Sequence, residues 1–136
     1  MKPTPDDCVH LTVEIVLEIH SQALKNFGGS PGIRDEGLLA SAVFAPQSTF
    51  GGKSPFADII EVAAAYLFYL CGNHPFVDGN KRVAFAVVDV FLRINGYSIT
   101  ADSKAIYDHM IKLVEARAFD LEHLVPWLQE IVRPRA

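Results

Sequence analysis

The sequence predicts an all-α protein of about six helices, folded as one domain over residues 1–136. Three observations indicate this class. Half of the 136 residues are hydrophobic, which is enough for a core without disulfides or metals. Apolar residues recur at intervals of three and four, the period of a helix. Capping residues stand before the apolar segments, and glycine or proline follows them.

The first predicted helix covers residues 12–27, with Thr12 as its N-cap. Its apolar face is formed by Val13, Val16, Leu17, His20, Leu24 and Phe27. The sequence GGSPG ends this helix. Asp35 then caps a short helix over 36–45, which Pro46 closes.

Two very apolar helices are predicted in the middle of the chain. Ser54 and Pro55 predict the start of the first, because proline fits the first helical position, and Gly72 predicts its end. The second covers residues 80–94 and ends at an Asn-Gly pair. Its four valines also suit a strand, but the segment is long for a strand and its glycine stop favours a helix.

The last third of the chain predicts a short extended segment at 97–100 and two further helices, over 103–117 and 121–132. An aspartate that can act as N-cap precedes each helix. We expect Pro126 to bend or shorten the last one.

Composition excludes several classes of protein. The 12 Lys and Arg residues against 16 Asp and Glu residues give a charge of −4, which argues against direct nucleic-acid binding. Only two cysteines, Cys8 and Cys71, indicate a reducing, cytoplasmic setting. The N-terminus lacks the apolar core of a signal peptide, and no apolar run is long enough to span a membrane. We therefore expect no membrane partner.

The segment HPFVDGNKR, residues 74–82, places many polar groups directly before an apolar helix. The N-terminus of a helix exposes unpaired N–H groups and partial positive charge, so it suits phosphate. Gly79 leaves room for a phosphate, and Asn80 can hold the loop through its amide. Lys81 and Arg82 oppose the helix dipole, which indicates an anionic ligand.

Two residues of the same segment suit chemistry on a phosphate. Asp78 can hold Mg²⁺ together with phosphate oxygens. His74 can accept the proton of an attacking hydroxyl. Each residue alone is better explained as a cap, a turn or a solvated face. Their combination on one loop predicts transfer of a phosphate-containing group.

This segment closely resembles the signature of the Fic/Doc (Fido) family, H-P-F-x-[DE]-G-N-[GK]-R. Segments 32–43, 46–52 and 91–97 also resemble Doc-type ("death on curing") toxins. The resemblance implies the compact helical Fic/Doc fold for the whole chain, with ATP and Mg²⁺ as cofactors. The site residues that it implies are His74 as general base, Asp78 as Mg²⁺ ligand, the backbone of Gly79 and Asn80 as anion hole, and Asn80, Lys81 and Arg82 as phosphate contacts.

Two positions distinguish the branches of the family. Fic enzymes that transfer AMP usually have glycine at the position of Lys81 and a second arginine at the position of Phe85. The lysine is typical of Doc proteins, so the resemblance implies a protein kinase. It would transfer the γ-phosphate of ATP to a hydroxyl of a translation elongation factor such as EF-Tu and so arrest translation. AMP transfer to a protein hydroxyl and a catalytically idle binding module are the alternatives.

The resemblance also implies a partner. Doc toxins are usually paired with a small antitoxin, whose flexible tail folds as a helix into a groove on the toxin. Some Fic proteins carry their own inhibitory helix with the motif [ST]-x-x-x-E-[GN]. This sequence has no such motif, so we expect the restraint to come from another protein.

Several other residues receive simpler interpretations. Arg34 is expected in a local ion pair, and Asp89 has no evident partner. Residues 51–53 belong either to a flap over the site or to a surface loop. Helix-face or surface positions are expected for His10, His20, His109 and His123.

Overall fold

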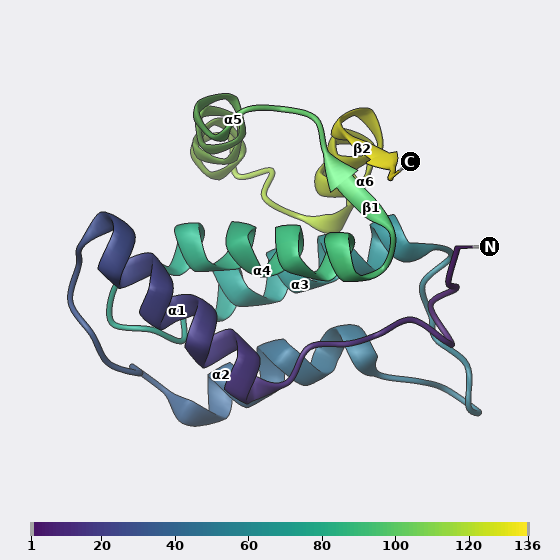
Figure 1. The fold of residues 1–136 in the computed structure, drawn as a ribbon, viewed down its shortest axis with the longest axis horizontal. Helices are drawn as coiled ribbons and strands as arrows, with labels where there is room; N and C mark the ends of the chain where they lie inside the picture. The colour runs from purple at the N-terminus through teal and green to yellow at the C-terminus, as the bar shows by residue number, and fades with distance from the viewer. Residues whose placement is uncertain (1, 136) are drawn as a thin grey trace.

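The computed structural model describes residues 2–135 and consists mainly of helices. The helices are α1 (Val13–Phe27), α2 (Glu36–Phe44), α3 (Ile59–Asn73), α4 (Asn80–Ile94), α5 (Ser103–Glu115) and α6 (Leu121–Ile131), with a short 3-10 turn, η1 (Ala45–Gln47), after α2. Helices α3 and α4 form a central pair, with α1 and α2 on one side and α5 and α6 on the other (Figure 1). The all-α prediction with six helices is confirmed.

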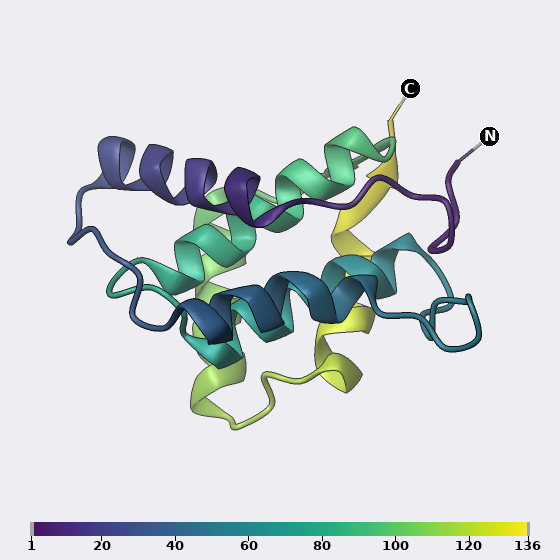
Figure 2. The ribbon, with the colours of Figure 1, turned by 90° about the horizontal axis from the view of Figure 1, so that it is seen from below.

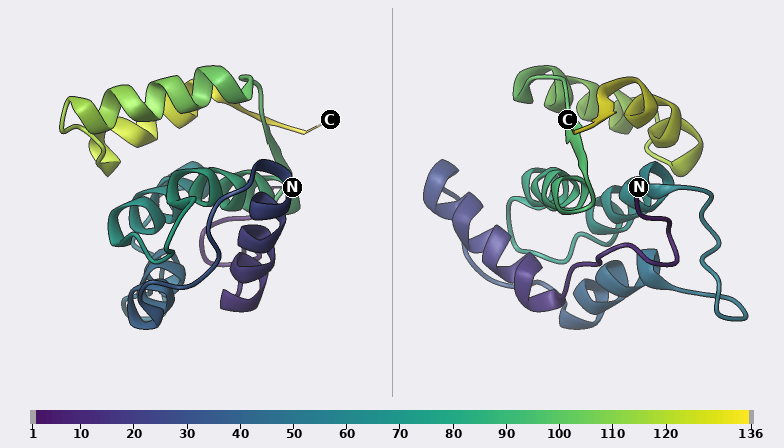
Figure 3. Two further views of the ribbon diagram at one scale, coloured as in Figure 1. Left: turned by 90° about the vertical axis from the view of Figure 1, so that its left-hand side faces the viewer. Right: turned by 45° about the vertical axis from the view of Figure 1, so that its right-hand side comes forward.

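Helix α3 is the buried centre of the molecule. Every residue from Val62 to Leu67 is at most 2% exposed. A helix that is apolar all round must be covered on all sides, and α2, α4 and α6 pack around α3. The side view in Figure 3 shows the pairs of helices stacked above and below this centre. The end of α3 is therefore a fixed platform for the loop that follows it.

Side-chain caps begin five of the six helices. The N-caps Thr12, Asp35, Asp58, Asp102 and Asp120 each accept a hydrogen bond from a backbone N–H in the first turn. Helix α4 differs, because its N-cap is Gly79 and no side chain caps it. The helix without a side-chain cap therefore begins inside the HPFVDGNKR segment, residues 74–82.

Helix α3 begins later than Ser54 and Pro55 predicted. Asp58 is its N-cap and accepts a hydrogen bond from the Glu61 N–H at 2.9 Å. The Ser54 hydroxyl instead accepts a hydrogen bond from the Phe56 N–H at 3.2 Å within a turn. The predicted start is wrong because a second capping residue lies nearer to the buried stretch.

The C-terminal part adds a small sheet to the helices. Strand β1 (Tyr97–Ile99) pairs antiparallel with β2 (Val132–Pro134). The extended segment predicted at 97–100 is confirmed, whereas the predicted helix over 121–132 ends one residue early because Val132 belongs to β2. Pro126 does not shorten α6, which continues to Ile131. No helix within residues 2–135 is long and apolar enough to cross a membrane.

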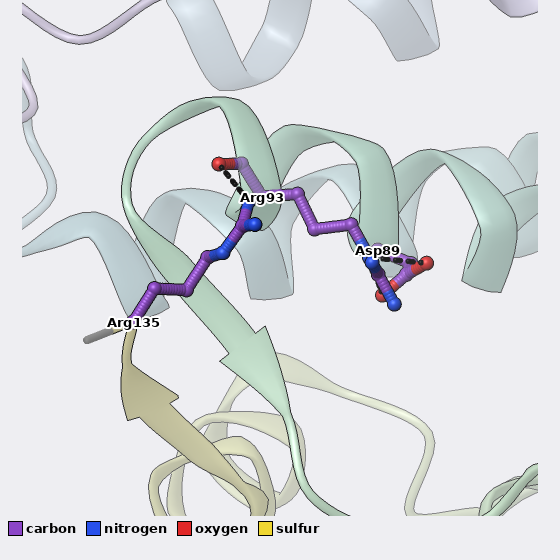
Figure 4. Close-up of polar contacts among 3 residues, drawn as sticks. All are labelled: Asp89, Arg93 and Arg135. Carbon is purple, nitrogen blue, oxygen red and sulfur yellow. Dashed lines mark hydrogen bonds and ion pairs between the residues drawn. The ribbon is translucent and has the colours of Figure 1, made fainter.

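Asp89 has a partner on its own helix. Its two carboxylate oxygens accept hydrogen bonds from the Arg93 Nε at 3.2 and 3.1 Å (Figure 4). The Arg135 side chain donates to the Arg93 carbonyl oxygen at 3.3 Å. The C-terminal end of the chain is thus tied to the end of α4.

Residues 47–54 lie far from the polar segment. Phe50 and Lys53 form a bridge around a tight turn, in which Gly51 and Gly52 have φ of 59° and 82°. This hairpin precedes α3 and the HPFVDGNKR loop follows it, so about 22 Å of helix separates them (Figure 2). The flap interpretation is therefore wrong, and the surface-loop interpretation holds.

The two competing starts of α3 can be tested by mutation. Asp58→Ala removes the N-cap and should lower the free energy of unfolding by about 1 kcal/mol, measured by urea denaturation. Ser54→Ala is the matched control and should cost clearly less, because its hydroxyl caps no helix. An equal or larger loss for Ser54→Ala would place the helix start at Ser54.

Candidate active site

The predicted site residues line one pocket at the turn between α3 and α4. Its volume is about 420 Å³, within the range of small-molecule sites. Helix α5 closes the pocket with Tyr107 and Ile111. The loop and α4 contribute His74, Val77, Asp78, Gly79, Asn80, Lys81 and Arg82. All six residues that the sequence singled out are therefore brought together.

The side chain of Asn80 holds the loop in shape. Its Oδ1 accepts a hydrogen bond from the Phe76 N–H at 2.9 Å, and its Nδ2 donates to the Phe76 carbonyl oxygen at 2.9 Å. The residue is only 6% exposed. The prediction that Asn80 holds the loop through its amide is confirmed. Because the amide is used within the loop, a phosphate contact from Asn80 would come from its backbone N–H.

The same amide also contacts the His74 ring. The two bonds to Phe76 set the orientation of the amide, so its NH₂ group faces the imidazole. The Asn80 Nδ2 lies 3.0 Å from His74 Nδ1 and 3.4 Å from Nε2. An N–H donor bonds only to an unprotonated ring nitrogen. This contact therefore holds the imidazole of His74 beside the start of α4, at the wall of the pocket.

The backbone of His74 adopts an unusual conformation. Helix α3 continues past Gly72 to Asn73, and His74 follows with φ of 51° and ψ of 55°. This left-handed conformation is uncommon for a residue other than glycine. Arg34 stabilises it by donating from Nε to the His74 carbonyl oxygen at 2.6 Å and from Nη2 to that of Asn73 at 2.8 Å. Gly72 is thus not the end of the helix, and the expected ion pair of Arg34 is replaced by these carbonyl contacts.

The side chain of His20 packs against the HPFVDGNKR loop. Its ring stacks on the buried Phe76 ring, with centroids 3.9 Å apart and planes 9° from parallel. Its Nε2 lies 3.2 Å from the Asp78 carbonyl oxygen, which accepts only from a protonated nitrogen. Its helix-face position is confirmed, but the sequence missed this supporting role. The available signal was its place between Val16 and Leu24 on the apolar face of α1.

The connection between α1 and α2 packs against the HPFVDGNKR loop. Ile33 and Phe76 form an antiparallel bridge, and the Ser30 N–H donates to the Asp78 Oδ2 at 3.1 Å. Gly29 approaches so closely that a Cβ would lie 2.9 Å from this same oxygen. The sequence identified this segment only as the end of a helix.

Asp78 can supply one ligand of a magnesium site, but the described side chains do not supply a full set of ligands. Its Oδ1 accepts from the Gly79 N–H at 2.9 Å, and its Oδ2 accepts from Ser30, so each oxygen keeps a free lone pair. No group of three or more metal-binding side chains exists within residues 2–135. Mg²⁺ often binds to one or two carboxylates while phosphate oxygens complete its coordination. The donor set therefore fits Mg²⁺ only together with a phosphate ligand.

The start of α4 has the properties of an anion site. The backbone N–H groups of Asn80, Lys81 and Arg82 have no acceptor in the described part of the chain. Gly79 has φ of 79° and no side chain to cover them. The first turn contains no acidic residue, and neither cation forms an ion pair with residues 2–135. Free N–H groups and two free cations at a helix N-terminus suit a phosphate.

Neither cysteine can supply a competing nucleophile. Burial raises the pKa of the Cys71 thiol to about 12, although Lys81 opposes this shift. Burial also raises the pKa of Cys8. Thiols with raised pKa values stay protonated near neutral pH and react poorly.

Fold and site together define a mainly helical protein whose two central helices are joined by the HPFVDGNKR loop, with a pocket at the start of α4. A model of the Fic/DOC family matches residues 10–92. This match covers more than half of the sequence, so the chain belongs to the Fic/Doc family.

Two curated relatives agree with this assignment. "Toxin Doc" of Mycolicibacterium smegmatis (strain ATCC 700084 / mc(2)155) is 47% identical over 76 residues, which cover 56% of this chain and 58% of that protein. "Protein kinase doc" of Escherichia phage P1 is 32% identical over 90 residues, which cover 66% of this chain and 71% of the phage protein. The match to the mycobacterial toxin thus spans less than two thirds of that protein.

The contact of Asn80 with the His74 ring can be tested separately from the contribution of Asn80 to stability. Asn80→Asp keeps the acceptor but loses the donor to Phe76 and His74, so unfolding free energy should fall by about 1–3 kcal/mol. Asn95→Asp is a matched control, because Asn95 is equally buried and bonds the Val9 and Phe91 backbone at the other end of α4. Both changes should lower stability in urea denaturation. Only Asn80→Asp should shift the ring-nitrogen NMR signals of His74, and unchanged signals would contradict the assigned contact.

Proposed function

We propose that this protein is a Doc-type toxin of a toxin–antitoxin pair that transfers the γ-phosphate of ATP to a hydroxyl group of a protein. The observation that carries this proposal is the pocket itself. One loop presents a histidine, a carboxylate with free lone pairs and a helix N-terminus with two cations that form no ion pair within residues 2–135. The names of the two relatives, a toxin and a protein kinase, support the same reading.

The residues would divide the reaction among them. The N-terminus of α4 with Lys81 and Arg82 would bind the phosphates, and Asp78 would share Mg²⁺ with their oxygens. The metal would neutralise charge that develops on the phosphates. His74 would accept the proton of the attacking hydroxyl, whose oxygen forms the new bond to phosphorus. The bond between the γ-phosphorus and the bridging oxygen breaks, and ADP leaves.

The surroundings of Phe85 favour phosphate transfer over AMP transfer. AMP-transferring relatives are expected to have a second arginine at this position. Here the Phe85 ring packs edge-on against Tyr107 at 5.7 Å and lines an apolar cavity between α4 and the α5–α6 pair. It does not line the phosphate pocket. The pocket therefore lacks the second arginine that would hold a further phosphate.

The protein target is proposed as a translation elongation factor of the EF-Tu type. This follows from the resemblance to Doc toxins and would explain arrest of growth. AMP transfer and an idle binding module remain the alternatives, and the presence of both His74 and Asp78 argues against the idle module.

The reaction can be identified with labelled ATP. The protein, Mg²⁺ and a bacterial extract are incubated with ATP labelled at either the α- or the γ-phosphate. Label should pass to a protein only from the γ position, and mass spectrometry of the labelled band should identify an elongation factor. His74→Ala should reduce labelling by about 10²- to 10⁴-fold because the general base is lost.

His123→Ala is the matched control, because within residues 2–135 this exposed histidine pairs only with Asp120, the N-cap of α6. It should leave labelling and growth arrest unchanged. Label from the α position would establish AMP transfer instead. Growth arrest that survives His74→Ala without any labelling would establish the binding module.

An apolar groove between α1, α4 and α5 suits the helical tail of an antitoxin. Its volume is about 320 Å³. Its apolar lining consists of Ile19, Ala23, Phe27, Ala86, Val90 and Tyr107, with polar residues of α1 at the rim. An amphipathic helix places its apolar face into such a groove. Arg82 borders both this groove and the phosphate pocket, so a bound tail would lie beside the site.

The groove can be tested with a small antitoxin protein, which should first be sought in the neighbouring reading frames. Val90→Asp places a charge in the apolar groove and should weaken binding of that protein at least about tenfold in calorimetry. Ile94→Asp is the control, because Ile94 lies on the same helix, is 46% exposed and does not line the groove. Equal weakening by both changes, with both variants folded, would place the antitoxin elsewhere.

A further inference from the structure

The side chain of Arg82 lies where three cavities meet. It lines the phosphate pocket, the apolar groove and a third cavity of about 240 Å³ beside α1. Its guanidinium forms no hydrogen bond or ion pair with residues 2–135. Because no anionic side chain holds this partly covered cation in place, another kind of contact must fix its position.

Two aromatic rings hold this guanidinium. Its central carbon lies 4.0 Å from the centroid of the Phe27 ring and 5.3 Å from that of the Tyr107 ring. Phe27 is the last residue of α1, and Tyr107 lies on α5. Two elements far apart in the sequence thus meet at one side chain of α4.

The type of contact matters for what Arg82 can bind. A carboxylate partner would use the N–H groups of the guanidinium and neutralise its charge. Stacking on an aromatic face orients the planar group and leaves the N–H donors at its edge free. The arrangement therefore fixes the position of a cation while its charge and donors remain available to a phosphate.

This role also explains the position of Phe27. The sequence placed Phe27 on the apolar face of its helix, but its side chain is 63% exposed. It lies at the end of α1, where the chain turns away through Gly28 with φ of 80°. An exposed phenylalanine at a helix end contributes little to a core. Its close contact with Arg82 is the interaction that accounts for its orientation.

We propose that Phe27 and Tyr107 are positioning residues, which hold the Arg82 guanidinium at the wall of the phosphate pocket and so increase the affinity for a nucleoside triphosphate. The proposal rests on the function proposed above, because it takes the pocket as the ATP site. It adds two residues outside the HPFVDGNKR loop to that site. Neither ring needs to touch the nucleotide for this effect.

Calorimetric titration with MgATP tests the proposal. Phe27→Leu removes the ring and should weaken ATP binding about three- to tenfold, the size expected for a cation–π contact. Phe27→Tyr and Tyr107→Phe keep a ring and should bind as tightly as the unaltered protein. Phe50→Leu is the control for an exposed phenylalanine at the far end of the molecule, where the side chain is 74% exposed.

A double-mutant cycle separates positioning from a general structural effect. In an Arg82→Ala background, Phe27→Leu should cause no further loss of ATP affinity, because the ring acts through the missing guanidinium. A further loss of the same size would overturn the proposal, as would undiminished affinity of Phe27→Leu alone. An unaltered protein that does not bind MgATP would overturn the proposed function itself and this inference with it.

Discussion

The two hydrogen bonds between the Asn80 amide and the Phe76 peptide are the constraint on which the site depends. They close the loop between the two central helices and leave no freedom in the direction of the amide. The remaining N–H of that amide then faces His74, and α4 begins directly at Asn80. One buried side chain thereby sets the shape of the loop, the position of the histidine ring and the place where α4 begins.

The site is built from features that do not favour stability by themselves. Helix α4 lacks the side-chain cap that the other helices have, and a glycine in place of a capping side chain costs roughly a few tenths of a kcal/mol. Two cations stand at the positive end of its dipole, and His74 has a left-handed backbone. The surrounding contacts compensate, because Arg34 binds the end of α3 and the buried α3 supports the loop. Such an arrangement is expected where a ligand completes the missing interactions.

Residues outside the HPFVDGNKR loop also position the groups of the site. The connection between α1 and α2 binds Asp78 and pairs with Phe76, and His20 stacks below it. Helices α1 and α5 supply the rings that hold Arg82. The same two rings line the apolar groove, so a partner in that groove and a nucleotide in the pocket would contact a common set of residues.

The sequence by itself determined the helical class, most helix limits and the grouping of the candidate site residues on the HPFVDGNKR loop. These properties depend on neighbours three to four residues apart, such as the Asp35 and Asp102 caps, and such spacings can be read directly. The wrong start at Ser54 shows that even local signals compete. Only the tertiary structure decided which distant residues complete the site: His20 reaches Asp78 across 58 positions, and Arg34 reaches His74 across 40. Such contacts depend on how the helices pack, and no spacing along the chain records that geometry.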